Sequence, residues 1–460
     1  MSLRAVLALL ILSAAPAAAQ PLAPVEASVR RSGDAFVAEF SFPRSAPAWA
    51  FFRSARAEVD QQPWRARSWT VLTPGVTLQR RGRYDAIVGV GGSPVPRRVQ
   101  VRIVPFTRQL ASDYVPALLL GGRGVALFDG HFAAFSVADP AALERFGVEP
   151  PEGVIGDGGT RVRFIGGRSL RIAGDVAGYR RGESSGAYGL FDVARAQVAN
   201  GIATVIDSET PAWLAQYIAR FTPTALGVLQ ARLGPSGIAE PTVLAAWEGA
   251  ANDGASMNGG TLKGLILMRL EGKAALTPNP ALREMARWFI AHEAAHFWLG
   301  QAVAYEGSRD SWIMEGGADL LAARTVQRLD PAYSPTPFLN QAIRDCAAAL
   351  VKPVATAPER GEHRTTYACG TIFALAAERA SGGDFYGFAR TLIARHRSRG
   401  MVNSENWLDL LTVTAGRPGP ARQVRAMLDG GAAEPKAAIA TLLRASGVPF
   451  TLSADGLPTL

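Results

Sequence analysis

Two histidines four residues apart, His292 and His296, are separated by Glu293 and two alanines in a stretch with helical character over 280–300. Because an α-helix has 3.6 residues per turn, positions i and i+4 lie on one face, and both imidazoles can reach the same metal ion. A carboxylate beside the first histidine is well placed to accept a proton from a metal-activated water. The pattern predicts a zinc-bearing helix, with Glu293 as the general base.

The pentapeptide alone has a second interpretation, since two histidines on an apolar helix can also be ordinary core residues. A zinc site that keeps one position open for water needs a third protein ligand. Eighteen residues separate His296 from Glu315. A loop over 301–308 and an N-cap at Asp310 or Ser311 would place Glu315 early on a second helix, facing the first. Glu315 is therefore the predicted third ligand.

Asp319 follows Glu315 by four residues and falls on the same helical face. A zinc-bound histidine usually donates its other ring N–H to a carboxylate or a carbonyl oxygen. We therefore expect Asp319 to hold His292 in this way. The alternative is a carboxylate on the solvated face of the helix.

The complete pattern resembles the gluzincin zinc metallopeptidases of the aminopeptidase N type and, more distantly, the glycyl aminopeptidases. The resemblance extends over about 240–415 and rests first on the spacing and on one run, Trp312-Ile313-Met314-Glu315-Gly316-Gly317-Ala318-Asp319. The segment 264–269 resembles a strand that lines the cleft of that family. Tyr367, three residues before Gly370, resembles the family's transition-state tyrosine. The resemblance implies one Zn²⁺ per chain, a peptide or protein substrate and a catalytic role for Tyr367; an ordinary half-buried tyrosine is the alternative.

The chain departs from this family at 258–263, where the resemblance implies a glutamate that grips the free amine of a substrate. Thr261 or Leu262 occupies that place, and the segment has no carboxylate. Glu248 and Asp253 are close in the sequence, but we interpret them as loop charges. The departure favours an endopeptidase, or an exopeptidase with an unusual amine anchor.

Residues 1–19 have the features of a secretory signal peptide: Arg4, a short apolar core and three alanines at 17–19. No later stretch reaches eighteen uninterrupted apolar residues, so no transmembrane anchor is expected. The net charge is +9, but the arginines are scattered and lack interleaved aromatic residues, which argues against a nucleic-acid partner. These features predict a periplasmic or secreted protein. They do not indicate an oligomeric state.

Cys346 and Cys369 are the only cysteines of the chain. In an exported protein an even number of cysteines permits a disulfide. Such a bond would fix the backbone two residues from Tyr367, and we expect reduction to loosen that segment. The alternative is two free, buried thiols.

The predicted fold class is α+β, with a β-rich N-terminal domain of sandwich or saddle type followed by a thermolysin-like, mainly helical domain with a small sheet. Alternating apolar patterns predict strands in the first domain at 35–42, 86–90, 99–105 and 161–165. His131, in that domain, is expected to be structural. The predicted units are 1–19, 20–205, 206–430 and a C-terminal tail over 431–460.

In the second domain we expect a helix over 213–233, a strand over 242–247, a Gly-rich loop over 249–260 and a cleft-edge strand over 262–270. The predicted function is zinc-dependent hydrolysis of peptide bonds. Two alternatives stay open. One is a catalytically silent, peptidase-like domain that binds peptides or proteins; the other is a zinc hydrolase of a non-peptide substrate.

Overall fold

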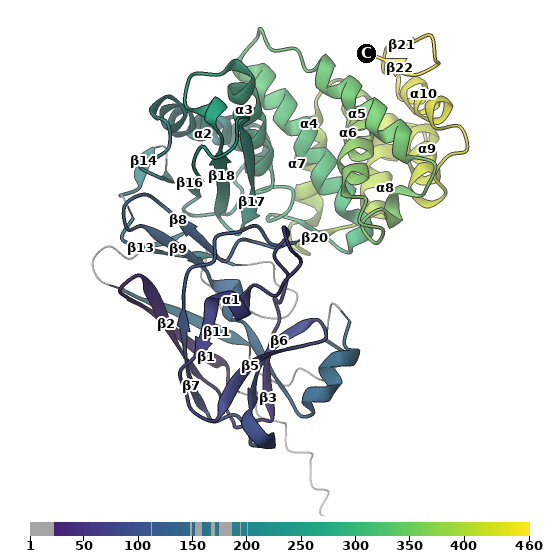
Figure 1. Ribbon diagram of the computed structural model, residues 1–460. Coiled ribbons are helices and arrows are strands. Elements are labelled where there is room, and N and C mark those ends of the chain that lie inside the picture. The colour runs from purple at the N-terminus through teal and green to yellow at the C-terminus, as the bar shows by residue number, and fades with distance from the viewer. Residues whose placement is uncertain are drawn as a thin grey trace, which may run out of the picture.

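The computed structural model describes residues 23–111, 113–147, 150–151, 159–166, 171–173, 186–193, 195–199 and 201–460. The predicted signal peptide, 1–19, lies outside these residues. Figure 1 shows two regions in contact, a β-rich one built from the first half of the chain and a mainly helical one built from the second half. The predicted α+β class is confirmed.

The N-terminal region contains two sheets that face one hydrophobic core, as alternation of apolar side chains along strands requires. Phe40, Trp49 and Phe51 are fully buried in this core. The first sheet has the order β11 (Thr160–Ile165), β1 (Val25–Ser32), β2 (Ala35–Ser41), β7 (Arg98–Ile103) and β4 (Trp69–Val71). The second has the order β10 (Ala134–Val137), β3 (Ala48–Phe51), β6 (Tyr84–Gly89) and β5 (Val76–Arg81), with the short helix α1 (Arg65–Ser68) before β4.

A third sheet connects the two regions. Its order is β12 (Arg171–Ala173), β13 (Tyr188–Phe191), β9 (Val125–Phe128) and β8 (Ala117–Leu119). Leu118 and Tyr188 of this sheet share a core cluster with Leu244 and Leu265 of the second region. In Figure 1, β8, β9 and β13 lie directly beneath the helical region. This apolar contact joins the two regions over one buried surface.

The sheet of the second region has the order β14 (Gln197–Ala199), β15 (Ile202–Ile206), β16 (Thr242–Trp247), β18 (Leu265–Glu271) and β17 (Ser256–Leu262). Because β14 and β15 belong to this sheet, the region begins before residue 205, the predicted boundary. Residues 256–260, at the end of the predicted Gly-rich loop, belong to strand β17. It pairs antiparallel with β18, and β17 rather than the predicted 262–270 strand forms the sheet edge.

In the part of the chain that the structure describes, nine longer helices share one core cluster. They are α2 (Ala212–Leu233), α3 (Pro280–Ala295), α4 (Ser311–Leu329), α5 (Thr336–Ala349), α6 (His363–Ala380), α7 (Phe385–His396), α8 (Ser404–Ala415), α9 (Gly419–Asp429) and α10 (Pro435–Ser446). The predicted tail, 431–460, is not separate, because Ile439 and Leu443 of α10 are fully buried in this cluster. Among the described residues, no helix has the length and apolar character that a membrane span needs.

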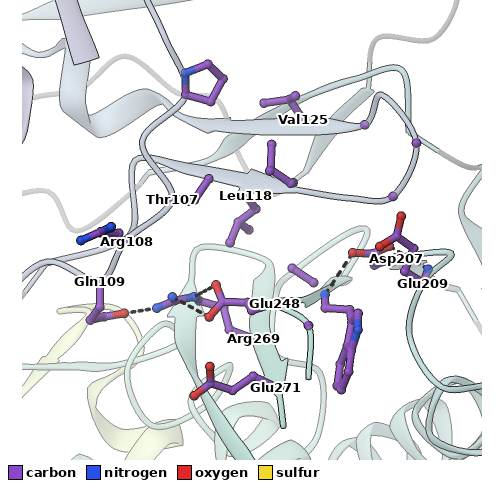
Figure 2. A pocket seen from close by; sticks show the side chains of 18 of the residues that line it. Thr107, Arg108, Gln109, Leu118, Val125, Asp207, Glu209, Glu248, Arg269 and Glu271 are labelled. Atoms are coloured by element: carbon purple, nitrogen blue, oxygen red, sulfur yellow. Dashed lines mark hydrogen bonds and ion pairs between the residues drawn. The ribbon is translucent and has the colours of Figure 1, made fainter. Parts of the chain in front are cut away.

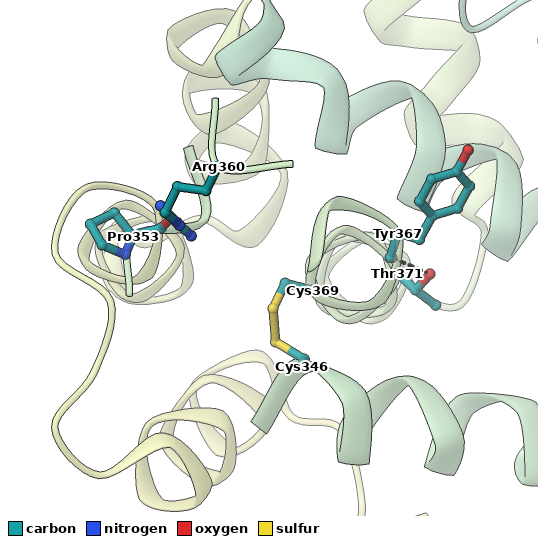
Figure 3. The surroundings of a disulfide bond; sticks show 6 residues. All are labelled: Cys346, Pro353, Arg360, Tyr367, Cys369 and Thr371. Atoms are coloured by element: carbon teal, nitrogen blue, oxygen red, sulfur yellow. Dashed lines mark hydrogen bonds between the residues drawn. A yellow bond between two sulfur atoms is a disulfide. The ribbon is translucent and has the colours of Figure 1, made fainter. Parts of the chain in front are cut away.

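A disulfide between Cys346 and Cys369 joins α5 to α6. Both residues are completely buried. Figure 3 shows Cys369 on the side of α6 that faces α5, while Tyr367 and Thr371 lie on the opposite side of the same helix. The disulfide therefore attaches α6 to α5 on the side of α6 that is opposite to Tyr367 and Thr371.

Replacing both cysteines with alanine is expected to lower the free energy of unfolding by about 3 kcal/mol, because the crosslink restricts the unfolded chain across a separation of 23 residues. Urea unfolding of the wild type and the double variant measures the difference, and mass analysis under non-reducing conditions verifies the bond. An unchanged unfolding midpoint, with the bond intact in the wild type, would contradict this expectation. Peptidase activity of the double variant shows whether loss of the disulfide loosens the segment around Tyr367.

Candidate metal centre

The helix α3 begins at a well-defined N-cap. The Asn279 side chain accepts a hydrogen bond from the Leu282 N–H at 3.2 Å, and Pro280 occupies the first helical position, where its missing N–H costs nothing. The helix ends at Ala295, five residues earlier than predicted. His296 nevertheless keeps helical dihedral angles (φ −65°, ψ −15°), so it still lies one turn after His292 on the same face.

Three nitrogen and oxygen atoms converge between α3 and α4. The Nε2 atoms of His292 and His296 are 3.1 Å apart, and Oε2 of Glu315 lies 3.5 Å from the first and 3.4 Å from the second. Zinc with bonds of 2.0–2.1 Å in a tetrahedral site has ligand–ligand distances of about 3.3 Å. Glu315 Oε2 is also buried without a hydrogen-bond donor. The donor set and its spacing therefore fit a zinc ion.

The second nitrogen of each imidazole has a partner on the side away from this point. His292 Nδ1 lies 2.9 Å from Asp319 Oδ1, and His296 Nδ1 lies 2.9 Å from the carbonyl oxygen of Leu299. Asp319 Oδ2 in turn accepts a hydrogen bond from the Thr371 hydroxyl at 3.2 Å. In the tautomer that carries its proton on Nδ1, each histidine has Nε2 as the metal-facing acceptor. Asp319 is buried rather than on a solvated face.

Replacing Asp319 with asparagine is expected to weaken zinc binding about 10- to 100-fold, because the neutral amide supports the basicity and orientation of His292 less well. The amide oxygen can still accept the Thr371 hydrogen bond, so the packing around residue 319 is kept. Zinc titration against a competing chelator measures the change. A dissociation constant within threefold of the wild-type value would show that Asp319 contributes little to the metal centre.

Close packing of α4 on α6 places Tyr367 beside the three converging side chains. A Cβ atom on Gly316 would lie 2.0 Å from the carbonyl carbon of Gly370, and one on Gly370 would lie 2.4 Å from the carbonyl oxygen of Trp312. Only glycine at both positions allows this approach. The Tyr367 ring consequently stacks on that of His292, with centroids 5.8 Å apart. Tyr367 lies in the second turn of α6, four residues after the helix begins at His363.

Electrostatics of the centre follow from this packing. Burial raises the pKa of Glu315, but the two histidines outweigh burial and hold that pKa well below its usual range. Burial, together with the charges of Glu315 and Glu293, raises the pKa of Tyr367 well above its ordinary value. Glu315 is therefore an anionic acceptor at neutral pH, and the Tyr367 hydroxyl keeps its proton and can donate a hydrogen bond.

Glu293 lies on α3 next to these groups and is 7% exposed. Its Oε2 atom accepts a hydrogen bond from the hydroxyl of Thr261, on the edge strand β17, at 2.7 Å. Glu293, Glu315, Tyr367 and Thr261 all line one cavity of about 800 Å³. Tyr114, from the N-terminal region, lines the same cavity.

Two further cavities lie nearby, and one of them adjoins this cavity. A cavity of about 650 Å³ shares Tyr114 and Gly259 with the first, and it shares Glu248 and Arg269 with another of about 1290 Å³ between the two regions. Figure 2 shows the Arg269 guanidinium bound to the Glu248 carboxylate on one side and to Gln109 of the N-terminal region on the other. A series of three cavities with shared lining residues therefore runs from the candidate metal centre, past β17 and β18, to the contact with the N-terminal region.

Neither carboxylate near the predicted amine-binding segment reaches the metal centre. Glu248 is held by Arg269 at 2.7 and 2.8 Å, and the Asp253 side chain is 92% exposed and paired with Lys273. Among the described residues that line the 800 Å³ cavity, only Glu293 and Glu315 carry carboxylates. The structure thus brings together the predicted ligands, base and tyrosine, without a further carboxylate for a substrate amine.

Two residues close to Glu293 were not expected from the sequence to belong to this site. In the sequence, Thr261 is notable only as one of two possible occupants of the position where the resemblance implies a glutamate, and no motif marks Tyr114. The Tyr114 hydroxyl donates to the carbonyl oxygen of Thr261 at 3.0 Å, across 147 residues of sequence. No periodic pattern links positions that far apart. His131 lies outside the metal centre, where its Nε2 contacts the Tyr114 carbonyl oxygen at 2.9 Å.

Comparisons with known proteins give similarity at the level of structure. No family model matches the chain, and the search of curated proteins also gives no match. Two structures of an M1 zinc metallopeptidase from Deinococcus radiodurans are similar, one of them a mutant bound to a Tyr-Ser-Ala substrate. They share 13% and 14% identity, cover 89% of this chain and 94% and 93% of theirs, and have TM-scores of 0.45 and 0.44. A likeness this distant leaves the function to be argued from the side chains of the metal centre.

Proposed function

We propose that the protein is a zinc metallopeptidase that hydrolyses peptide bonds. The observation that carries the proposal is the convergence of His292, His296 and Glu315 at 3.1–3.5 Å, beside a buried carboxylate and a protonated tyrosine. When bound, zinc supplies Lewis-acid chemistry and lowers the pKa of a water molecule towards neutrality. The three ligands would hold it, and Asp319 would orient His292.

Glu293 is proposed as the general base. Glu293 lines the same cavity as Glu315 and Tyr367. Its carboxylate can therefore accept a proton from the attacking water and return that proton to the leaving amine. Tyr367 is proposed to donate a hydrogen bond to the oxygen on which negative charge develops. Because burial raises the pKa of Tyr367, its hydroxyl is protonated and suited to this role at neutral pH.

The substrate is proposed to be an extended polypeptide cut at an internal bond. Both carboxylates that line the 800 Å³ cavity already have assigned roles, so neither is left to bind a free α-amine. The adjoining cavities along β17 and β18 offer room for residues beyond the scissile bond. An edge strand can also bind an extended chain through its main-chain groups. These features favour an endopeptidase.

Export is part of the same proposal. Residues 1–19 have the pattern of a signal peptide, and the disulfide between Cys346 and Cys369 suits an oxidising compartment such as the periplasm. We therefore propose a periplasmic or secreted enzyme. Mass analysis of the mature protein from its native host, with the N-terminal residue determined, tests this part of the proposal.

The activity is tested with a diverse peptide mixture, using peptides with free and with acetylated N-termini in matched pairs. We expect zinc-dependent cleavage of both members of each pair, loss of cleavage with a chelator and recovery with added zinc. Cleavage restricted to free N-termini would overturn the endopeptidase assignment. Stoichiometric zinc without cleavage of any peptide would favour a binding domain or a hydrolase of non-peptide bonds.

A further inference from the structure

The hydroxyl of Thr261 makes a specific contact with the proposed base. Thr261 Oγ1 lies 2.7 Å from Glu293 Oε2 and 2.9 Å from the backbone carbonyl oxygen of the same residue. A hydroxyl has one proton to donate, and a carboxylate is the stronger acceptor of the two. Over the described part of the chain, Thr261 is the one side-chain donor within hydrogen-bond distance of the Glu293 carboxylate. Oε1 then stays available for a water molecule.

The position of Thr261 is itself fixed from the helical side. It pairs with Ile266 in the hairpin of β17 and β18. The turn of this hairpin is bound by Gln301, whose side-chain oxygen accepts from the Gly264 N–H at 3.0 Å and whose amide donates to the Leu262 carbonyl at 2.7 Å. Gln301 follows His296 by five residues. The end of the metal-bearing segment therefore holds the hairpin in register with α3.

The N-terminal region fixes Thr261 from the other side. The Tyr114 hydroxyl donates to the Thr261 carbonyl oxygen at 3.0 Å. Tyr114 is in turn held by three contacts: its N–H donates to Asp113 at 2.8 Å, its carbonyl contacts His131 at 2.9 Å, and its ring packs on Phe128 with centroids 5.2 Å apart. Asp113 is paired with Arg53 at 2.6 Å. The proposed base is thus linked, through two hydrogen bonds, to Tyr114 and its contacts in the β-rich region.

We propose that Thr261 is a positioning residue for Glu293, and that Tyr114 of the N-terminal region supports it. Thr261 holds one carboxylate oxygen of the base, so that the other faces the reacting water. This inference rests on the proposed function. Displacing a catalytic group by about 1 Å can lower the rate about 100-fold. The N-terminal region is therefore part of the catalytic apparatus as well as a wall of the cleft.

The test compares Thr261→Val, which keeps the shape but removes the hydroxyl, with Thr261→Ser, which keeps the hydroxyl. We expect the valine variant to lose about 10- to 100-fold in kcat, with KM and zinc content unchanged, and the serine variant to stay within about threefold of the wild type. Tyr114→Phe is expected to lower kcat by a smaller factor. Thr242→Val, at the start of β16, is the matched control and should have no effect.

Two results would overturn the inference: a valine variant with wild-type kcat, or a serine variant as impaired as the valine variant, which would indicate a packing role. Crystal structures of the wild type and of Thr261→Val give a readout that needs no turnover. The Glu293 carboxylate should move in the variant, and an unchanged carboxylate would also reject the inference. Failure of the proposed function is distinguishable, because it would appear as a wild type that holds zinc and cleaves no peptide.

Discussion

Replacing Glu293 with glutamine is expected to lower kcat about 100- to 10,000-fold while leaving zinc bound. The amide cannot accept a proton from water, and general acid–base catalysis contributes about 10²- to 10⁴-fold. Its oxygen can still accept the Thr261 hydrogen bond, so the geometry around residue 293 is kept. Glu293 is not one of the three converging ligands, and the metal content should therefore equal that of the wild type.

The measurement is steady-state hydrolysis of one cleaved peptide, together with metal analysis of the same preparations. Glu284→Gln is a suitable control, because Glu284 lies on the same helix with its side chain 52% exposed. Peptidase activity of Glu293→Gln within tenfold of the wild type would contradict the assigned role. Loss of zinc from this variant would instead place Glu293 among the ligands.

Replacing His296 with alanine is expected to abolish stoichiometric zinc binding, since it removes one of three converging donors. A ligand present at 1,000 times its dissociation constant stabilises the folded state by about 4 kcal/mol, and this zinc-dependent gain should vanish in the variant. His296 is preferable to His292 for this test, because its Nδ1 contacts a backbone carbonyl and its loss leaves no buried carboxylate without a partner.

Thermal unfolding with and without added zinc measures the gain for both proteins. His363→Ala, at the exposed start of α6, is the control and should keep the wild-type response. An equal zinc-dependent shift in His296→Ala and the wild type would contradict the proposed ligand set. Peptide hydrolysis should fall to the background level in the same variant.

Some of the metal centre was predictable because it depends on local geometry. The spacing of His292 and His296 fixes a shared helical face, and Asp319 shares a face with Glu315 for the same reason. The paired cysteines likewise restrict where α5 and α6 can meet. Strand positions in the β-rich region followed from alternation, and the observed β2, β6, β7 and β11 overlap the predicted segments.

Other features were not predictable from local pattern. The predicted loop over 249–260 contains two consecutive glycines, Gly259 and Gly260, which usually weaken a strand, yet pairing with β18 makes this segment the sheet edge. A Cβ on Gly259 would lie 1.9 Å from the Leu267 carbonyl oxygen, so glycine is required by a neighbour that the local pattern does not reveal. The region boundary was misplaced for a similar reason, because β14 and β15 are assigned by the sheet they join.

The sequence by itself determined which side chains of the proposed metal centre share a helical face: His292 with His296 on one helix, and Glu315 with Asp319 on the other. The tertiary structure alone decided what surrounds these side chains. It placed the Thr261 hydroxyl against the Glu293 carboxylate and brought the Tyr114 hydroxyl, across 147 residues, to the Thr261 carbonyl oxygen. Of the described residues that line the cavity, only Glu293 and Glu315 carry carboxylates. The physical reason is that a shared helical face depends on residues three or four positions apart in the sequence. The contacts of Thr261 and Tyr114 depend instead on how the N-terminal and helical regions pack against each other.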